Sequence, residues 1–141
     1  MIKRILDKLM QKVNLIWFRR DLRVNDNWML STATQDNNLC LSFFIIDPYF
    51  YKKWSEVGNM RVKFLFESLE VLDTELKKLG SRLYLIEGES SSSIQLLTKN
   101  LLANDIEPKL FFHRDRQIIY GKTRDAEVVN FYKHNQLKIN I

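Results

Sequence analysis

The chain has 141 residues and a formal charge of +5, because 22 lysines and arginines outnumber 17 aspartates and glutamates. Its hydrophobic content of 45% is enough for one domain with a sizeable core and excludes intrinsic disorder, and its single cysteine, Cys40, excludes an internal disulfide. No apolar run approaches the roughly 20 residues that span a bilayer, so we expect a cytoplasmic protein without a membrane partner.

Residues 1–12 precede the first apolar run. Ile2, Ile5, Leu6 and Leu9 follow the spacing of one helix face, although Met10 is an alternative start of the chain. Two interpretations stay open for this segment: an extra surface helix, or a leader that is disordered or misannotated. We expect the folded domain to cover residues 13–141.

Five short apolar runs alternate with stretches long enough for a helix. They are Val13–Phe18, Leu39–Ile46, Arg82–Ile86, Lys109–Phe112 and Leu137–Ile141. This alternation predicts an α/β protein: a three-layer α/β/α sandwich, Rossmann-like, with a five-stranded parallel sheet of order 3-2-1-4-5. Ligands of such sheets bind beyond the carboxyl ends of the strands where the order reverses, which here brings together residues 19–27 and 113–121.

Four helices are predicted between these strands. A short one starts near Asp26, and a second begins at a serine hydroxyl cap within 90–93 and runs through Leu101. A third spans about 123–132, with Ala126 and Val129 facing inward and Val128 as a further candidate for that face. The clearest helix starts from Asn59 as N-cap and ends at Gly80. Its apolar residues, spaced by three or four, are Val62, Leu65, Phe66, Leu69, Leu72, Leu76 and Leu79.

The most unusual stretch is RRDLRVNDN at 19–27. Its arginines either hold a phosphate or carboxylate at the end of a strand, or form Arg–Asp pairs that pin a loop, with Asp26 capping the next helix. His113-Arg114-Asp115 is not a kinase motif, because Tyr120 stands where the magnesium-binding Asn belongs. Two histidines leave no metal cluster, and Asp47 before Pro48 is interpreted as a turn former.

Four segments together closely resemble the N-terminal domain of the DNA photolyase and cryptochrome family. They are WFRRDLRVNDN at 17–27, IIDP at 45–48, the stretch 58–88 and YGKTRDAEV at 120–128. The resemblance implies light-driven repair of cyclobutane or (6-4) pyrimidine dimers, or blue-light reception, by a full-length parent that uses FAD. In the family, FAD belongs to a helical C-terminal domain that is absent here. We therefore expect a non-catalytic fragment of a lyase, whose partners are that domain and, through the parent, DNA.

The N-terminal domain of this family often holds an antenna chromophore, which is a folate, a deazaflavin or a flavin. Folate-type members carry Asn-Glu where this chain has Tyr120-Gly121, so the resemblance favours a deazaflavin or flavin. The matching positions that it implies for cofactor binding are Phe44 and Ile46 as walls, Arg61 at the start of a helix, Asp115, and Gln117 in place of a commonly acidic residue. For residues 19–23 it favours the loop-pinning interpretation.

Three other interpretations remain: a free-standing α/β module that binds a nucleotide or another anion, a cryptochrome-like photoreceptor fragment, and a remnant without a ligand. The exposed surface distinguishes the free-standing module from a domain severed from its parent, because only the severed domain exposes a contiguous apolar patch. Tyr51 and Trp54 are candidates for such a patch, since they lie in an aromatic series, Tyr49, Phe50, Tyr51 and Trp54, that either stacks on a ring or packs on another domain.

Overall fold

The computed structural model describes residues 11–51, 58–116 and 118–141 and contains one five-stranded sheet. Its strands are β1 (Gln11–Phe18), β2 (Leu39–Ile46), β3 (Leu83–Glu87), β4 (Ile106–Phe111) and β5 (Lys138–Asn140). All four strand pairs are parallel, and their order is β3-β2-β1-β4-β5. The predicted fold class and strand order are confirmed.

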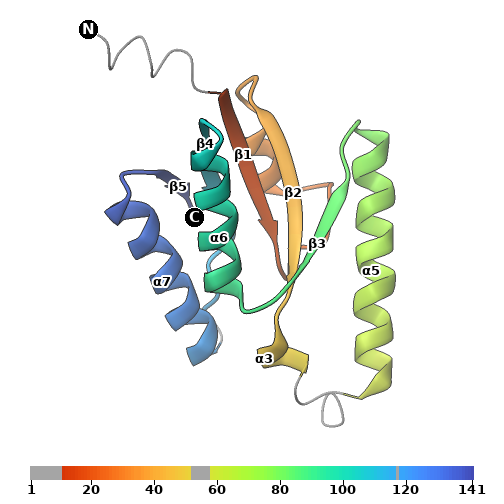
Figure 1. Cartoon of the computed structure of the whole chain (residues 1–141). Coiled ribbons are helices and arrows are strands. Elements are labelled where there is room, and N and C mark those ends of the chain that lie inside the picture. The colour runs from red at the N-terminus through yellow and green to blue at the C-terminus, as the bar shows by residue number, and fades with distance from the viewer. Residues whose placement is uncertain (1–10, 52–57, 117) are drawn as a thin grey trace, which may run out of the picture.

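Helices cover both faces of the sheet (Figure 1). α2 (Trp28–Ala33) and α5 (Asn59–Lys78) lie on one face, and α6 (Ser90–Ala103) and α7 (Ile119–His134) lie on the other. A short helix, α3 (Pro48–Tyr51), follows β2 at the carboxyl edge of the sheet. Within the described residues, no helix is long and apolar enough to cross a membrane.

The central strand β1 is apolar along nearly its whole length because both of its faces are covered. Its residues from Val13 to Phe18 are all buried, and Leu15 pairs with Leu41 on one side and with Leu110 on the other. β1 begins at Gln11, so the last two residues of the predicted leader belong to the sheet. Residues 1–10, on which the rest of that interpretation depends, lie outside the described part of the chain.

The N-caps predicted for three helices were wrong: two lie one residue away, and the third is a carboxylate instead of a serine hydroxyl. Asn27, not Asp26, caps α2, and its side chain accepts from the backbone N–H of Leu30 at 3.1 Å. Gly58, not Asn59, precedes α5. The α6 cap is the carboxylate of Glu89, which accepts from the N–H groups of Ser91 and Ser92. A carboxylate that takes two donors at a helix N-terminus is a stronger acceptor than a serine hydroxyl.

The apolar stripe of α5 is buried only in part. Leu69, Leu72 and Leu76 are buried against the sheet, whereas Phe66 and Leu79 are exposed. The helix is 20 residues long, far longer than the five-residue strand β3 beside it, so its ends extend past the sheet.

The inward face of α7 also differs from the prediction. Ala126 is exposed, whereas Val128 is buried and Val129 packs against the core. The buried positions also include Arg124, Asp125 and Tyr132. Ion pairs with residues distant in sequence, Arg19–Asp125 and Asp115–Arg124, hold charged side chains on the inward face of α7. The spacing of apolar residues alone does not reveal them.

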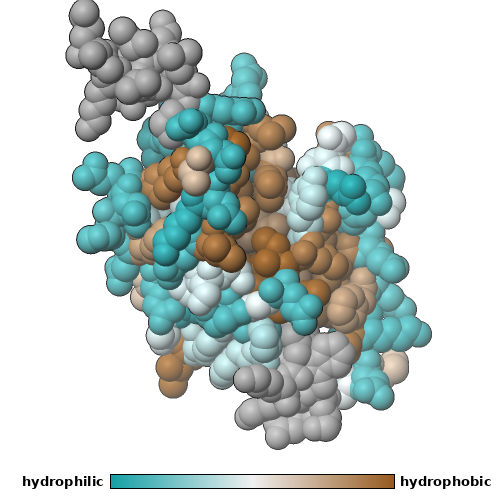
Figure 2. Space-filling view, viewed as in Figure 1, coloured by the Kyte–Doolittle hydropathy of each residue, from teal (hydrophilic) through white to brown (hydrophobic). Residues whose placement is uncertain are grey.

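Apolar side chains gather on the face of the molecule between α6 and α5, over β2 and β3 (Figure 2). On these two strands Leu39, Tyr84 and Leu85 are exposed, but Leu85 follows Tyr84 in the strand and so points to the opposite face of the sheet. Trp54 and the side chain of Tyr51, which were named for such a patch, lie outside what the structure describes. An open apolar sheet face of this kind is typical of a surface that another domain or partner covers.

Candidate cofactor site

The segments that follow β1 and β4 meet at the carboxyl edge of the sheet, as the strand order predicts. Nδ1 of His113 lies 2.7 Å from Oδ2 of Asp21. Beside this junction a cavity of about 290 Å³ opens, near the lower end of the roughly 300–1,000 Å³ found for small-molecule sites. Its lining comprises Trp17, Arg19, Arg20, Phe44, Ile45, Phe50, Arg61, Val62, Leu65, Ser90, Asp115 and Arg124.

Three of the five predicted site residues line this cavity. Phe44 reaches it from β2, Arg61 from the first turn of α5, and Asp115 from the loop after β4. Ile46 ends β2, packs against the hydrophobic core and is not among the lining residues. Gln117 lies outside the described residues.

Arg19 joins the end of β1 to α7. Its guanidinium donates to both carboxylate oxygens of Asp125, at 2.6 and 3.2 Å, and lies 4.5 Å from the ring centre of Trp17. Burial lowers the pKa of Arg19, and the Asp125 carboxylate opposes that shift. Such a two-pronged Arg–carboxylate pair fixes both position and orientation. Arg19 therefore pins the loop after β1, as the resemblance favoured, while it also forms part of the cavity wall.

Arg124 is a buried charged residue of the site, held between aromatic rings and carboxylates. Only 5% of this residue is exposed, and its guanidinium lies over the rings of Trp17 at 5.1 Å and Tyr120 at 5.6 Å. A terminal nitrogen is 3.6 Å from Asp115, and Nε is 3.5 Å from Asp125 but makes no hydrogen bond. Leaving a buried donor unpaired costs about 1–3 kcal/mol. An acceptor group bound in the cavity would find an arginine already held in place by aromatic rings.

Gly121 makes room for the carboxylate of Asp115. A Cβ atom built on Gly121 would lie 2.5 Å from Oδ2 of Asp115, far inside van der Waals contact. The N–H of Asp115 donates to Asp125 at 2.7 Å, so the loop cannot simply move away. Glycine at this position of α7 is therefore required by the site.

A second polar group, centred on Asp47, contacts the cavity lining through Ser90. Asp47 is buried and accepts four hydrogen bonds, from the N–H of Tyr49, the N–H and hydroxyl of Ser90, and the hydroxyl of Tyr120 at 2.6 Å. Burial by itself raises the pKa of Asp47, but the hydrogen bonds from Ser90, Tyr120 and Tyr49 outweigh it and lower that pKa. The predicted turn role accounts only for the bond from Tyr49.

Tyr120 links this group to α3. Its ring stacks on Tyr49 with centroids 3.7 Å apart and an interplanar angle of 8°. Burial and the Asp47 carboxylate raise the pKa of Tyr120, so its hydroxyl stays a hydrogen-bond donor at neutral pH. Both residues of the Tyr120-Gly121 pair thus have a structural role.

The cavity carries a surplus of positive charge. Four arginines and one aspartate, Asp115, line it, and a second aspartate, Asp125, lies behind it. Aromatic walls come from Trp17, Phe44 and Phe50. Flat apolar walls with arginine donors suit a planar ring that bears an anionic or strongly hydrogen-bond-accepting group.

Comparison with known proteins identifies the family. Residues 14–140 match the DNA photolyase family. The chain belongs to that family. It is 35% identical over 125 residues to cryptochrome-2 of Gallus gallus, an alignment that covers 89% of this chain and 20% of that protein. It is 43% identical over 84 residues to the (6-4) DNA photolyase of Arabidopsis thaliana, which covers 54% of this chain and 15% of that protein.

Solved structures of photolyase-family proteins share the fold. An archaeal photolyase from Sulfolobus tokodaii, described as holding two FAD molecules with implications for a novel light-harvesting cofactor, aligns with a TM-score of 0.71 and 26% identity. That alignment covers 90% of this chain and 28% of the archaeal one. A Synechocystis cryptochrome aligns with a TM-score of 0.80 at 21% identity, over 92% of this chain and 27% of that chain. This photolyase-family chain spans about a fifth of the length of its curated relatives.

Sequence reasoning missed several residues of the candidate site. It placed Trp17 in an apolar strand and gave Arg124 no role of its own. The Asp125 carboxylate contacts both Arg19 and Arg124, and it is 106 residues from Arg19 in sequence. One signal was present: Arg124-Asp125 lies within the YGKTRDAEV segment that carried the resemblance.

Proposed function

We propose that this chain is the N-terminal antenna domain of a deoxyribodipyrimidine photolyase-like protein. In this proposal the domain holds a light-absorbing ring in the cavity at the carboxyl edge of the sheet and performs no catalysis by itself. The parent protein repairs pyrimidine dimers in DNA with FAD in its C-terminal domain. When bound, the antenna supplies absorption of near-ultraviolet or blue light and passes the excitation to that FAD.

The observation that carries the proposal is the pairing of aromatic walls with held arginines. Phe44 and Phe50 provide apolar surface, and Arg61 and Arg124 provide donors beside it. Nε of Arg124 is held 3.5 Å from the Asp125 carboxylate, so the guanidinium stays fixed beside the cavity wall. Guanidinium donors are the kind that a ring carbonyl, a ring nitrogen or a phosphate oxygen satisfies. The cavity residues thus fit a flavin-type group.

A deazaflavin or flavin suits the α7 side of the cavity better than a folate does. A glutamate in place of Gly121 would put its Cβ against the Asp115 carboxylate and a second negative charge near the first. The arrangement around Tyr120 and Gly121 therefore supports an antenna of the deazaflavin or flavin type.

The test is retention of pigment by the purified chain. The protein is incubated in turn with a deazaflavin, FMN and methenyl-folate, desalted, and its absorption recorded. We expect a deazaflavin or FMN to be retained, and Arg61→Ala to lower the retained amount. Lys63→Ala is the matched control, because Lys63 lies on the same helix and pairs with Glu67 instead of lining the cavity. No retained pigment in protein with a native circular dichroism spectrum would contradict the proposal.

The surplus of arginines also favours a second candidate, an anion- or nucleotide-binding module. Arg19, Arg20, Arg61 and Arg124 converge on one cavity, as phosphate sites commonly require. Pyrophosphate and AMP separate the two candidates. A rise in melting temperature with either anion, and no pigment retention, would favour the binding module.

We further propose that the open apolar face over β2 and β3 packs against the C-terminal domain of the parent protein. The gathered apolar side chains between α6 and α5 support this role (Figure 2). Tyr84→Lys on this face should leave the isolated domain folded and weaken its association with a separately produced C-terminal domain.

A further inference from the structure

A smaller hollow adjoins the cavity of the candidate site. It has a volume of about 220 Å³ and lies between the segments that follow β1 and β4. Arg19, Arg20 and Asp115 line both spaces, so the hollow and the cavity meet at these three side chains. The other residues that line the hollow are Asp21, His113, Arg114 and Arg116. A ligand held in the cavity therefore has a second space beside it.

The hollow and the cavity differ in chemical character. Trp17, Phe44 and Phe50 give the cavity aromatic walls. Among the described residues that line the hollow, His113 is the only aromatic one, and the others are four arginines and two aspartates. A ligand that fills both spaces would join a flat apolar ring to a strongly polar group.

Both aspartates of the hollow are engaged within the protein. One carboxylate oxygen of Asp21 accepts from the backbone N–H of Arg19 at 3.1 Å, and the other lies 2.7 Å from Nδ1 of His113. The Asp115 side chain is only 7% exposed and lies 3.8 Å from the guanidinium of Arg20. The negative charge of the hollow is therefore already matched by groups of the protein.

Arg114 and Arg116 have no such partner. Both residues are exposed and line the hollow. Within the described part of the chain, neither guanidinium makes an ion pair or a hydrogen bond with the protein. Two like charges that line one space repel each other, and an anion between them relieves that repulsion. The hollow thus has two arginines available for an anionic group.

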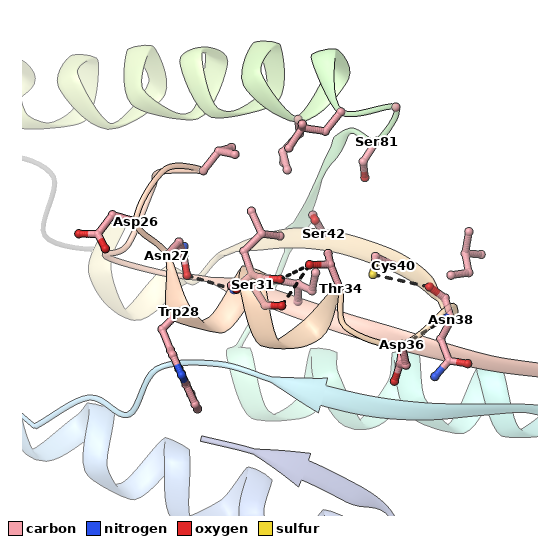
Figure 3. A pocket seen from close by; sticks show the side chains of 17 residues that line it. Asp26, Asn27, Trp28, Ser31, Thr34, Asp36, Asn38, Cys40, Ser42 and Ser81 are labelled. Carbon is pink, nitrogen blue, oxygen red and sulfur yellow. Dashed lines mark hydrogen bonds between the residues drawn. The ribbon is translucent and has the colours of Figure 1, made fainter.

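A larger hollow, on the face of the sheet that α2 and α5 cover, does not suit an anion. It has a volume of about 820 Å³ and lies beside α2 and the C-terminal end of α5 (Figure 3). Among the described residues that line it, the charged ones are Asp26 and Asp36 (Figure 3). Carboxylates repel a phosphate group, so size alone does not select the space for such a group. The charge of Arg114 and Arg116 selects the smaller hollow.

We propose that Arg114 and Arg116 bind the phosphate group of a phosphorylated flavin-type ligand whose ring lies in the cavity. This inference rests on the proposed function and narrows its ligand from flavin-type rings in general to phosphate esters of them, such as FMN. A phosphate monoester carries a charge of about −1.5 to −2 at pH 7 and offers three acceptor oxygens. Two arginines match that charge, and each can donate two parallel hydrogen bonds to it.

FMN and riboflavin test this proposal because they carry the same ring and differ only in the terminal phosphate. Each is titrated into the full 141-residue chain, and its dissociation constant is measured by quenching of flavin fluorescence. We expect FMN to bind at least about tenfold more tightly than riboflavin. The double variant Arg114→Ala/Arg116→Ala should bring the affinity for FMN down to that for riboflavin. Arg23→Ala/Lys133→Ala is the matched control, because it removes the same charge from exposed positions outside both spaces and should keep the preference for FMN.

Three outcomes separate the phosphate site from the antenna cavity that it adjoins. Equal affinities for FMN and riboflavin in the unsubstituted chain would overturn the phosphate site and leave the antenna cavity standing. A preference for FMN that Arg114→Ala/Arg116→Ala keeps would also overturn it, by placing the phosphate elsewhere. Failure of both flavins to bind to the folded chain would contradict the antenna proposal itself, and the phosphate site with it.

Inorganic phosphate gives a readout without a flavin. At equal ionic strength, phosphate in place of chloride should raise the melting temperature of the unsubstituted chain more than that of Arg114→Ala/Arg116→Ala, because only the former binds the anion in the hollow. The comparison between the two proteins cancels the general effect of phosphate on protein stability. An equal shift in the two proteins would overturn the proposal.

Discussion

Asp115 fills the space that a side chain at position 121 would need. The Oδ2 atom of Asp115 lies 2.5 Å from the point where a Cβ on Gly121 would stand. From that place the carboxylate faces Arg124 at 3.6 Å and Arg20 at 3.8 Å. One glycine in the first turns of α7 thus determines where the negative charge of an arginine-rich cavity lies.

Gly121→Ala should destabilise the protein, although alanine is ordinarily the better helix former by about 1 kcal/mol. The methyl group displaces Asp115, and such overpacking costs about 1–3 kcal/mol. The free energy of unfolding in urea measures the effect. Ala126→Gly is the matched control, because Ala126 is exposed on the same helix and should lose only about 1 kcal/mol. A stabilised Gly121→Ala variant would show that Asp115 has room to move.

Asp125→Asn should be among the most destabilising single changes in the chain. It removes the carboxylate that pairs with Arg19 at 2.6 Å and leaves a nearly buried guanidinium without its partner. Breaking a buried pair in this way costs about 3–5 kcal/mol. Glu67→Gln, which breaks an exposed i,i+4 pair with Lys63, should cost no more than about 0.5 kcal/mol. Similar urea midpoints for the two variants would contradict the prediction.

Acid should destabilise the fold through Asp47. The pKa of Asp47 is lowered in the folded state, so its stabilising contribution is present above the unfolded-state pKa of about 4 and is lost as pH falls through the folded-state pKa. Tyr120→Phe removes one of the hydrogen bonds that lower this pKa, so the loss of stability between about pH 5 and pH 2 should become smaller. Urea midpoints across this pH range give the slope.

Tyr49→Phe is the control for that measurement. Tyr49 reaches Asp47 through its backbone N–H, and its ring stacks on Tyr120, so the variant keeps both contacts. Its acid slope should equal that of the parent chain. A reduced slope in Tyr49→Phe would instead assign the pH effect to the stacked rings.

The strands and their order could be predicted because each depends on a local pattern and a general topological rule. The buried run from Val13 to Phe18 is apolar whichever neighbours cover it. The charged site could be predicted only in part. The strand order brings Arg19 and Asp115 to the same edge of the sheet, but only the folded chain shows that Arg124 of α7 shares their cavity. Asp47 illustrates the same limit, since its turn position is visible in sequence but its bond to Tyr120, 73 residues away, is not.

Arg124→Lys tests whether the shape of the arginine matters beyond its charge. Lysine keeps a positive charge near Asp115 and Asp125, but it lacks the planar group of donors that lies 5.1 Å from the ring centre of Trp17. We expect retention of a flavin-type pigment to fall by about tenfold, which corresponds to about 1.4 kcal/mol. Titration by fluorescence quenching measures the affinity. Lys122→Ala, an exposed change on the same helix, is the control and should bind as the parent chain does. Unchanged affinity in Arg124→Lys would mean that the cavity uses only the charge of Arg124 and not its planar shape.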